Sequence, residues 1–488
     1  MTYFPNTMSA PAPEPDWDNL VTLDFSGPRI GLDAAQAEAL CAPVLVEGRV
    51  DFERLVLSTR AFSREAAAVV ASIIPRLPRL CSLIFSDIIA GRKEEEALAV
   101  YRTLAGAFEG GRQVLEVDLS SNAMGQKGLV ACGRILEGQA GLQRLMLRSN
   151  GISAETAQDL AWLLLRGPPT ALRTLHTMDN MAGASGAIAL ADIVARSPHL
   201  RDFMFASSRG GPAGGVALAR ALAHTPALQR LCLRDNMLQA GTCAALAASL
   251  PGLPALRHLD LGDIQMGGPG LAALAEGLRA APAAPHLTHL DVSCNDLQAR
   301  DAAVLGALLP HLPALATLRA QENEFGSSGA VALGVGLLRR AAGAGGAAPL
   351  QELDLRSCRL GSAGAVAVVR AALAGVVGGA SARRVDVSGN RVSQVGLARA
   401  LAAVAAAGLP EAALVCGAGD EDEDEEETEE EGEGEGGAAQ EQDLLLTVHT
   451  PVAAAERKAA VAPPRPSTVT SEDWDKARQA VQQGVLVL

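Results

Sequence analysis

The side chains with the greatest capacity for chemistry in this 488-residue chain are eight histidines and eight cysteines. His286 and His289 stand three positions apart but match no recognised metal-ligand pattern, so we expect structural roles for both. The chain has no H-E-x-x-H motif, no nucleophile elbow and no G-x-x-x-x-G-K phosphate loop. Glycine-rich stretches such as 211–215 recur at one phase of a repeat, which indicates turns. We therefore predict that the chain has no catalytic centre, cofactor or metal site of its own.

The cysteines indicate the compartment. None forms a C-x-x-C pair, and Cys232, Cys294 and Cys358 fall in or beside repeat positions, so we interpret them as buried thiols without disulfides. This usage is typical of a reducing, intracellular environment. Residues 1–18 lack the basic start and apolar run of a signal peptide, and no stretch approaches 18 uninterrupted apolar residues. These features predict no membrane insertion.

A repeat of about 28 residues organises most of the chain. Each copy has apolar residues at alternate positions followed by asparagine or a substitute, as in LEVDLSSNAMGQKG from Leu115 and LQRLCLRDNML from Leu228. Successive spacings are 28, 30, 28, 28, 28, 31, 28, 35 and 32 residues. The period identifies a leucine-rich-repeat solenoid. The recurring polar position holds Asn122, Asn150, Asn180, Ser208, Asn236, Ile264, Asn295, Asn323, Cys358 and Asn390.

The pattern of each copy predicts a short strand and a turn. Alternate residues such as Leu231 and Leu233 point to one side of a strand and form the core. The asparagine amide is expected to bond neighbouring backbone groups that would otherwise be buried without partners. Cys358 is an accepted substitute at that position, whereas Ile264 is not, so we predict one missing hydrogen-bonding rung.

Alanine- and leucine-rich sequence with helical spacing follows each turn, as in GTCAALAASL at 241–250. The fold class is therefore α/β, a ribonuclease-inhibitor-like horseshoe with parallel strands on the concave face and helices on the convex face. Weaker copies begin at Val21, Arg54 and Ser82. They extend the repeat domain to 19–416, about thirteen units, after a disordered N-terminus at 1–18.

The chain's acidity is concentrated after the repeats. Residues 420–435 carry thirteen acidic side chains of a net charge of −14, which leaves the remainder near −1. We predict a disordered acidic linker at 417–443, either a solubilising segment or a docking segment for a basic partner. A tail at 444–488 follows. It contains a helix-like pattern from Thr470 to Val481, which is either a short docking helix or part of a mobile end.

Function is expected to reside on the ridge of loops between strand ends and helix starts, and on the concave sheet. Charges of both signs on this ridge indicate a polar protein interface, and the basic excess that nucleic acid requires is absent. The candidate residues are Arg92, Lys93, Ser121, Lys127, Arg148, Ser149, Asp179, Arg234 and Asp235.

Several of these stretches resemble a known family. FSDIIAGRKEEEALAVYRTLAGAF at 85–108, followed by LEVDLSSNAMGQKG, LRSNGIS, MDNMAG, SSRGGPAGGVALARAL and LRDNM, resembles the Ran GTPase-activating proteins, and their plant members most closely. The resemblance covers about residues 20–410. Generic repeat proteins share the leucines but not S-D-I-x-x-G-R-x-x-E-E.

The resemblance implies a protein that binds Ran in its GTP form and accelerates hydrolysis. Members of the family are thought to orient the GTPase's own glutamine and the attacking water without an arginine finger, unlike the arginine route of other GTPases. The matching arginine is Arg92, for which a contact with Ran and a loop-stabilising ion pair with Glu94–Glu96 are the alternatives. An accessory Ran-binding protein is a further candidate partner.

One departure from the family lies in LRSNG. The family places an asparagine near the nucleotide just before the turn asparagine, and the matching position here is Ser149, with Asn150 as the turn residue. Serine is shorter and lacks the amide's paired donor and acceptor. Either activity is reduced, or Asn150 or a neighbour substitutes, and we expect activity to be retained.

A second departure concerns location. Plant members carry an N-terminal domain of about a hundred residues that directs them to the nuclear envelope, whereas about 18 residues precede the repeats here. We therefore expect a cytoplasmic monomer, with a perinuclear position left open. The competing hypothesis is a repeat scaffold that binds another intracellular protein.

Overall fold

The computed structural model describes residues 13–166, 170–343, 348, 350–374 and 384–416. The chain divides into two units, Met1–Asp422 and Glu423–Leu488, and the second lies wholly outside the described residues. The acidic linker predicted at 417–443 and the tail predicted at 444–488, with its helix-like pattern, therefore also lie outside them. All described residues belong to the first unit, which holds the repeats.

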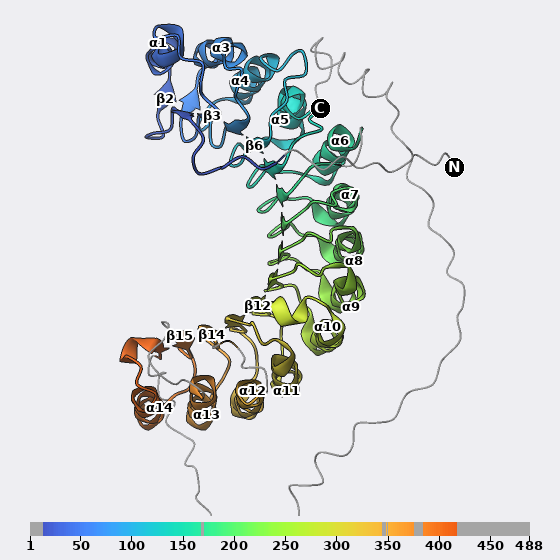
Figure 1. The fold of residues 1–488 in the computed structure, drawn as a ribbon, viewed down its shortest axis with the longest axis vertical. Coiled ribbons are helices and arrows are strands. Elements are labelled where there is room, and N and C mark those ends of the chain that lie inside the picture. The colour runs from blue at the N-terminus through green and yellow to red at the C-terminus, as the bar shows by residue number, and fades with distance from the viewer. Residues whose placement is uncertain (1–12, 167–169, 344–347, 349, 375–383, 417–488) are drawn as a thin grey trace, which may run out of the picture. The chain divides into compact units, whose positions relative to one another are not determined.

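Each repeat contributes one short strand to a parallel sheet. Fourteen strands pair in chain order within the described residues, and the helices lie on the outer side of the curved stack (Figure 1). The strands are β1 (Thr22–Asp24), β3 (Arg54–Val56), β5 (Ser82–Ile84), β6 (Glu116–Asp118), β7 (Arg144–Met146), β8 (Thr174–His176), β9 (Asp202–Met204), β10 (Arg230–Cys232), β11 (His258–Asp260), β12 (His289–Asp291), β13 (Thr317–Arg319), β14 (Glu352–Asp354), β15 (Arg384–Asp386) and β16 (Leu414–Val415).

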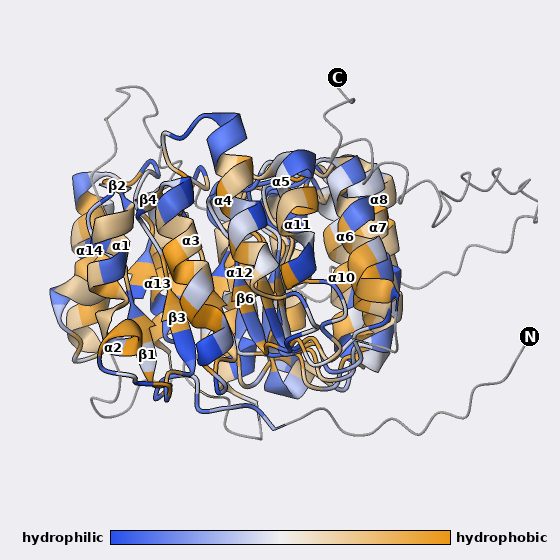
Figure 2. Cartoon of the chain, turned by 90° about the horizontal axis from the view of Figure 1, so that it is seen from above, coloured by the Kyte–Doolittle hydropathy of each residue, from blue (hydrophilic) through white to orange (hydrophobic). Residues whose placement is uncertain are grey.

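The helices pack against one another in the same order. Each has a side that faces the sheet and a side that faces solvent, and Figure 2 shows helices that carry both hydrophobic and hydrophilic residues. They are α1 (Ala34–Leu40), α2 (Ala42–Leu45), α3 (Arg64–Ile73), α4 (Glu94–Gly106), α5 (Gly125–Cys132), α6 (Ala154–Leu165), α7 (Gly183–Ala195), α8 (Gly211–Ala221), α9 (Gln239–Ser249), α10 (Gly267–Ala280), α11 (Ala299–Leu308), α12 (Gly326–Ala341), α13 (Ser362–Leu373) and α14 (Gln394–Ala406).

The core is a stack of aliphatic layers between sheet and helices. The register places the central residue of each strand beside its equivalent, as in Leu231 beside Leu259 and Leu259 beside Leu290. All three are buried. Small residues bring the helices close together, and Gly336 of α12 packs on the backbone of Gly306 in α11 with no room for a side chain. The predicted α/β leucine-rich-repeat solenoid is confirmed.

A ladder of asparagines ties successive turns together. Asn150 accepts from the Asn122 backbone N–H at 3.0 Å, and its own N–H donates to Asn180 Oδ1 at 3.0 Å. The Asn150 side-chain amide donates to the Leu119 carbonyl at 2.9 Å. Ser208 continues the ladder with its hydroxyl, which accepts from Asn180 N–H at 3.3 Å. These bonds satisfy backbone groups that are buried between repeats.

The rung predicted to be missing at Ile264 is missing. Where other turns use a side-chain amide, the Asn236 N–H donates instead to the Asp263 carbonyl at 2.9 Å. The Ile264 carbonyl accepts from Leu238 N–H at 3.1 Å and from Gln239 N–H at 2.8 Å. The backbone thus replaces the absent side chain, and the ladder resumes where Asn295 accepts from Ile264 N–H at 3.1 Å.

The structure adds detail near both ends of the predicted repeat domain. The repeat pattern predicts about thirteen units, but β16 adds a fourteenth strand, whose copy has no polar turn position to reveal it. A second, two-stranded parallel sheet joins β2 (Gly31–Leu32) to β4 (Ala61–Phe62). The prediction of a disordered N-terminus at 1–18 differs for 13–18: Glu14 pairs with Arg201, and Trp17 lies against Arg144.

Three further properties bear on function. No helix among the described residues is long and apolar enough to cross a membrane. Within the same residues no group of three or more histidine, cysteine, aspartate or glutamate side chains is placed to hold a metal ion. No disulfide joins any of the eight cysteines, and burial raises the pKa of Cys243 to about 12.

Candidate functional site

The loops after β6, β7 and β8 bring several candidate residues to one ridge. Ser121, Ser149 and Asp179 occupy the same loop position, with φ of 59°, 51° and 56°. Each N–H donates to a carbonyl of the next repeat, as in Ser121 N–H to Arg148 O at 2.7 Å. This left-handed conformation is strained for residues with side chains, and the inter-repeat bonds hold it. All three side chains are exposed.

Ser149 and Asp179 form a pair on this ridge. The Ser149 hydroxyl donates to Asp179 Oδ2 at 3.4 Å, a long hydrogen bond between two exposed side chains. Such a bond is easily replaced by a bond to a partner, because both groups already face water. The pair therefore offers one hydroxyl and one carboxylate to a protein that lies on the ridge.

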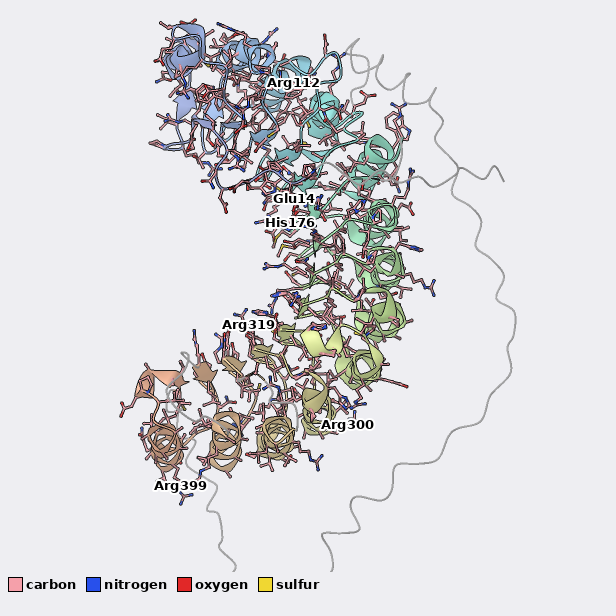
Figure 3. The ribbon with its side chains drawn as sticks, in the orientation of Figure 1. Glu14, Arg112, His176, Arg300, Arg319 and Arg399 are labelled. Carbon is pink, nitrogen blue, oxygen red and sulfur yellow. The ribbon has the colours of Figure 1, made fainter. Side chains whose placement is uncertain are left out.

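Arg148 lies beneath this pair and points toward the sheet. Its Nη2 is 2.6 Å from His176 Nδ1. A guanidinium only donates, so Nδ1 accepts, and the proton of the neutral ring lies on Nε2. His176 Nε2 is 3.2 Å from Asp202 Oδ1 without the alignment of a hydrogen bond. Arg148 is thus engaged internally, and Figure 3 shows His176 on the inner side of the sheet.

A hollow of about 670 Å³ lies over these strands on the concave face. Its walls include Ser121, Arg148, Ser149, His176 and Asp179, together with Arg144 and Glu116 from the sheet and Trp17 and Asp18 from the N-terminal segment. The lining is mostly polar and carries both charges. Its chemistry suits a polar protein or peptide surface.

Arg92 lies in the loop between β5 and α4, where it is anchored in two directions. Its Nη2 donates to the Ala61 carbonyl of β4 at 2.6 Å, and its Nη1 pairs with Glu96 Oε1 at 2.9 Å. The loop is joined to the next repeat where Ile88 N–H donates to Asn122 Oδ1 at 2.9 Å. The loop-stabilising ion pair that the sequence left open is therefore present, with Glu96 as the partner.

Lys93 and Lys127 lie at the edge of the same region. Lys93 is exposed immediately before α4. Lys127 Nζ pairs with Glu94 Oε1 at 2.7 Å and so links the starts of α5 and α4. Both partners of this pair are exposed, so it contributes less than about 1 kcal/mol to stability.

Arg234 and Asp235 lie further along the ridge. Arg234 pairs with Asp260 at 3.3 Å and with Asp291 at 2.7 Å. Burial opposes the charge of Arg234, but Asp260 and Asp291 outweigh it and raise the pKa of the guanidinium. Asp235 is exposed and has φ of 54°, like the ridge residues of the preceding repeats.

Asn150, the proposed substitute for the family's asparagine, is not part of the surface. It is fully buried, and its amide is used in the ladder between repeats. The exposed neighbours at this turn are Ser149 and, in the next repeat, Asp179. The amide of Asn150 is therefore not presented to a partner.

Sequence reasoning missed His176, Arg144 and the N-terminal segment as parts of this region. His176 is the last residue of β8 and faces the concave hollow, which strand alternation could have indicated. Arg144 is the first residue of β7 and pairs with Glu116 at 2.9 Å. The position of Trp17 over Arg144 has no local signal, because the two residues are far apart in the chain.

A comparison with protein families agrees with this architecture. A family model described as "Leucine Rich repeat" matches residues 283–306 and 347–369. A solved structure described as a crystal structure of a TLR13–ssRNA13 complex aligns with a TM-score of 0.39 at 15% identity, over 76% of this chain and 48% of that one.

Three relatives have more specific names. RAN GTPase-activating protein 1 of Arabidopsis thaliana is 34% identical over 132 residues, which is 27% of this chain and 24% of the relative. RAN GTPase-activating protein 2 of the same plant is 34% identical over 24% of this chain and 22% of the relative. Ran GTPase-activating protein 1 of Xenopus laevis is 30% identical over 182 residues, which is 35% of this chain and 31% of the relative. The match thus spans about a quarter of each plant relative's length.

The parallel sheet, the outer helices and the matched repeats define a leucine-rich-repeat solenoid protein. Within that class, the matched relatives make it a leucine-rich-repeat protein that resembles the Ran GTPase-activating proteins of Arabidopsis and Xenopus.

Proposed function

We propose that this protein stimulates GTP hydrolysis by a Ran-type small GTPase in its GTP-bound form. The observation behind this proposal is the similarity of part of the chain to three Ran GTPase-activating proteins. In this role the protein is a regulator that supplies contacts to the GTPase rather than bond-making groups. The process it serves is nucleocytoplasmic transport.

The proposed mechanism orients the GTPase's own glutamine and the attacking water without an arginine finger. Its support is the state of the ridge arginines. Arg92, Arg148 and Arg234 each bond to groups within this chain. An arginine finger would have to leave such bonds before it could reach a nucleotide. The exposed hydroxyl of Ser149 and carboxylate of Asp179 are the groups best placed to bind and orient a partner's side chain.

The partner also implies a setting. We infer a cytoplasmic monomer that keeps the GTPase in its GDP form outside the nucleus. A perinuclear position of this protein and an accessory Ran-binding protein as a second partner are parts of the same proposal. The mixed charges along the ridge support a polar and reversible interface of the kind that such regulation needs.

Single-turnover GTP hydrolysis by Ran, with and without this protein, tests the proposal. We expect an acceleration of at least about a thousandfold, as GTPase activators give. Ser149→Asn is expected to raise the rate, because it restores a longer side chain with a paired donor and acceptor, whereas Ser149→Ala lowers it. No acceleration by the wild type or by Ser149→Asn would contradict the proposal.

The Arg92→Ala variant separates the two roles of Arg92. If Arg92 contacts the GTPase, the variant loses activity while its thermal midpoint stays unchanged. If Arg92 only stabilises its loop through Glu96 and Ala61, activity and midpoint fall together, and Glu96→Gln produces a similar loss. Arg300→Ala is the matched control, since Arg300 is exposed at the start of α11 (Figure 3).

The second candidate function is a scaffold that binds another intracellular protein. It is favoured by one observation: a peptide segment, residues 14–18, already borders the hollow on the concave face. A scaffold would bind its partner without any change in the GTPase's hydrolysis rate, so the same assay distinguishes the two functions.

A further inference from the structure

The N-terminal segment 13–18 lies on the sheet side of the repeats, and Figure 3 places Glu14 on the inner side near His176. Glu14 Oε2 pairs with Arg201 Nη1 at 2.8 Å, and Glu14 Oε1 lies 3.5 Å from Arg173 Nε. These arginines come directly before β9 and β8. The segment is therefore held by side chains from consecutive repeats.

Trp17 makes the next contact of the segment. The Arg144 guanidinium carbon lies 4.9 Å from the centre of the Trp17 ring, a cation–π contact. Asp16 shapes the turn that presents this ring, because its side chain accepts from Asn19 Nδ2 at 2.7 Å. Trp17 and Asp18 then line the hollow. Three arginines, Arg144, Arg173 and Arg201, thus receive one tryptophan and one acid; we call them the arginine edge.

The bonds at the arginine edge are of a reversible kind. The Arg201 side chain is 43% exposed and that of Glu14 is 32% exposed, so water competes for their ion pair. Trp17 is only half-buried. Contacts for which water competes can be replaced by contacts to another segment of the same chemistry.

The sequence contains a second segment of this chemistry. Only three tryptophans occur in the chain, and two of them, Trp17 and Trp474, have an aspartate on both sides. The copies read Asp16-Trp17-Asp18 and Asp473-Trp474-Asp475. A glutamate lies three positions before Trp17, at Glu14, and two positions before Trp474, at Glu472. The second copy lies outside the described residues.

We propose that the arginine edge is a docking site for a segment with a glutamate shortly before an aspartate–tryptophan–aspartate sequence, filled by residues 14–18 and shared with the second copy at 472–475 of the same chain. The 56 residues between Cys416 and Asp473 extend to about 190 Å at most. From β16 to β7 the sheet has nine strand-to-strand steps, about 45 Å. The connecting chain is therefore long enough for the second copy to reach the edge.

The experiment is a titration that needs no GTPase, so its result does not depend on the proposed activity. A fluorescently labelled peptide of residues 468–480 is added to the full chain carrying Trp17→Ala and Trp474→Ala, and anisotropy is measured. We expect saturable binding. The chain with both tryptophans intact should bind the peptide at least tenfold more weakly, because its own segments occupy the edge.

Variants locate the site. Arg201→Ala and Arg144→Ala in the double-substituted chain should each weaken binding at least tenfold, as should Trp474→Ala within the peptide. Arg144 also pairs with the buried Glu116, so Arg201, whose side chain pairs with Glu14, is the variant that leaves the sheet intact. Arg300→Ala is the control and should bind like its parent.

Three outcomes would overturn the proposal. They are no saturable binding to the double-substituted chain, binding unchanged by Arg201→Ala and Arg144→Ala, and equal binding to the chain with both tryptophans intact. The last outcome would mean that the N-terminal segment does not occupy the site to which the peptide binds.

Discussion

Ser149 and Asn150 are neighbours in one turn and face opposite environments. The left-handed conformation at Ser149 directs its hydroxyl outward to Asp179, while the next side chain enters the ladder and is fully buried. One residue step thus separates a group that can contact a partner from one that supports the fold. A substitution at Ser149 is therefore expected to change binding, and one at Asn150 to change stability.

At the residue scale the structure also predicts a pH effect. His258 and His289 lie side by side on β11 and β12, with ring centres 4.9 Å apart. Burial lowers the pKa of both rings, and the positive charge of Arg230 lowers both pKa values further. Because the folded-state pKa lies below the unfolded value of about 6.5, the unfolded chain binds more protons. The contribution of the two histidines to stability is complete above the unfolded-state pKa of about 6.5 and is lost as the pH falls through the folded-state pKa.

The urea midpoint at pH 7.5 and at pH 5.0 measures this effect. We expect the loss of stability between the two values to be smaller in His258→Gln and in His289→Gln than in the wild type. His286→Gln provides the control, since His286 is exposed outside the strands. A loss of the same size in all three variants and the wild type would show that the pair does not contribute.

Much of the candidate ridge was predictable from the sequence, and the reason is periodic. The repeat fixes which residue follows each strand, so Ser121, Ser149, Asp179 and Asp235 were assigned to one line of loops. What the period does not encode is pairing between repeats. The bond from Arg148 to His176 and the ion pair of Glu14 with Arg201, 187 positions apart, leave no local pattern.

At the scale of elements, the asparagine ladder determines how one repeat is attached to the next. Asn295 accepts from Ile264 N–H and Met266 N–H, both at 3.1 Å, and donates to the Leu261 and Ser293 carbonyls at 2.8 Å. It therefore serves a repeat that has no polar side chain of its own at the ladder position.

We expect Asn295→Ala to cost about 3 kcal/mol, because it leaves two buried N–H groups without acceptors. The exchange of the Ile264 and Met266 amide hydrogens should accelerate by about a hundredfold, since about 1.4 kcal/mol corresponds to a factor of ten. Hydrogen exchange followed by mass spectrometry or NMR measures this. Arg300→Ala, on the outer surface of the same repeat, should leave both amides unchanged. Protection that stays at the wild-type level in Asn295→Ala would contradict the assigned role.

The N-terminal elements show a different means of attachment. Here the loop from β5 to α4 is nine residues long, and it is bonded both to β4 through Arg92 and to the turn after β6 through Asn122. The two-stranded sheet of β2 and β4 exists only in this region of the described chain. The sequence reveals the long loop but not the small sheet, because strands of two residues are too short to show alternation.

At the scale of the whole molecule, charge is distributed unevenly along the chain. Residues 420–435 carry thirteen acidic side chains, whereas the remainder is near −1. A block of this kind attracts a basic partner over a Debye length of about 10 Å at 0.1 M salt. If it steers the proposed GTPase, its effect must appear in the association rate and depend on salt.

Deletion of residues 420–435 is therefore expected to lower the association rate constant with GTP-bound Ran about tenfold at 20 mM salt and to leave it unchanged at 500 mM salt, as stopped-flow fluorescence would measure. Replacing the acidic residues with glutamine and asparagine at constant length separates charge from chain length. If the rates stay equal at both salt concentrations while the deleted chain precipitates at lower concentration, the run is a solubilising segment. Steering requires the rate loss, because screening acts on the encounter and not on the fold.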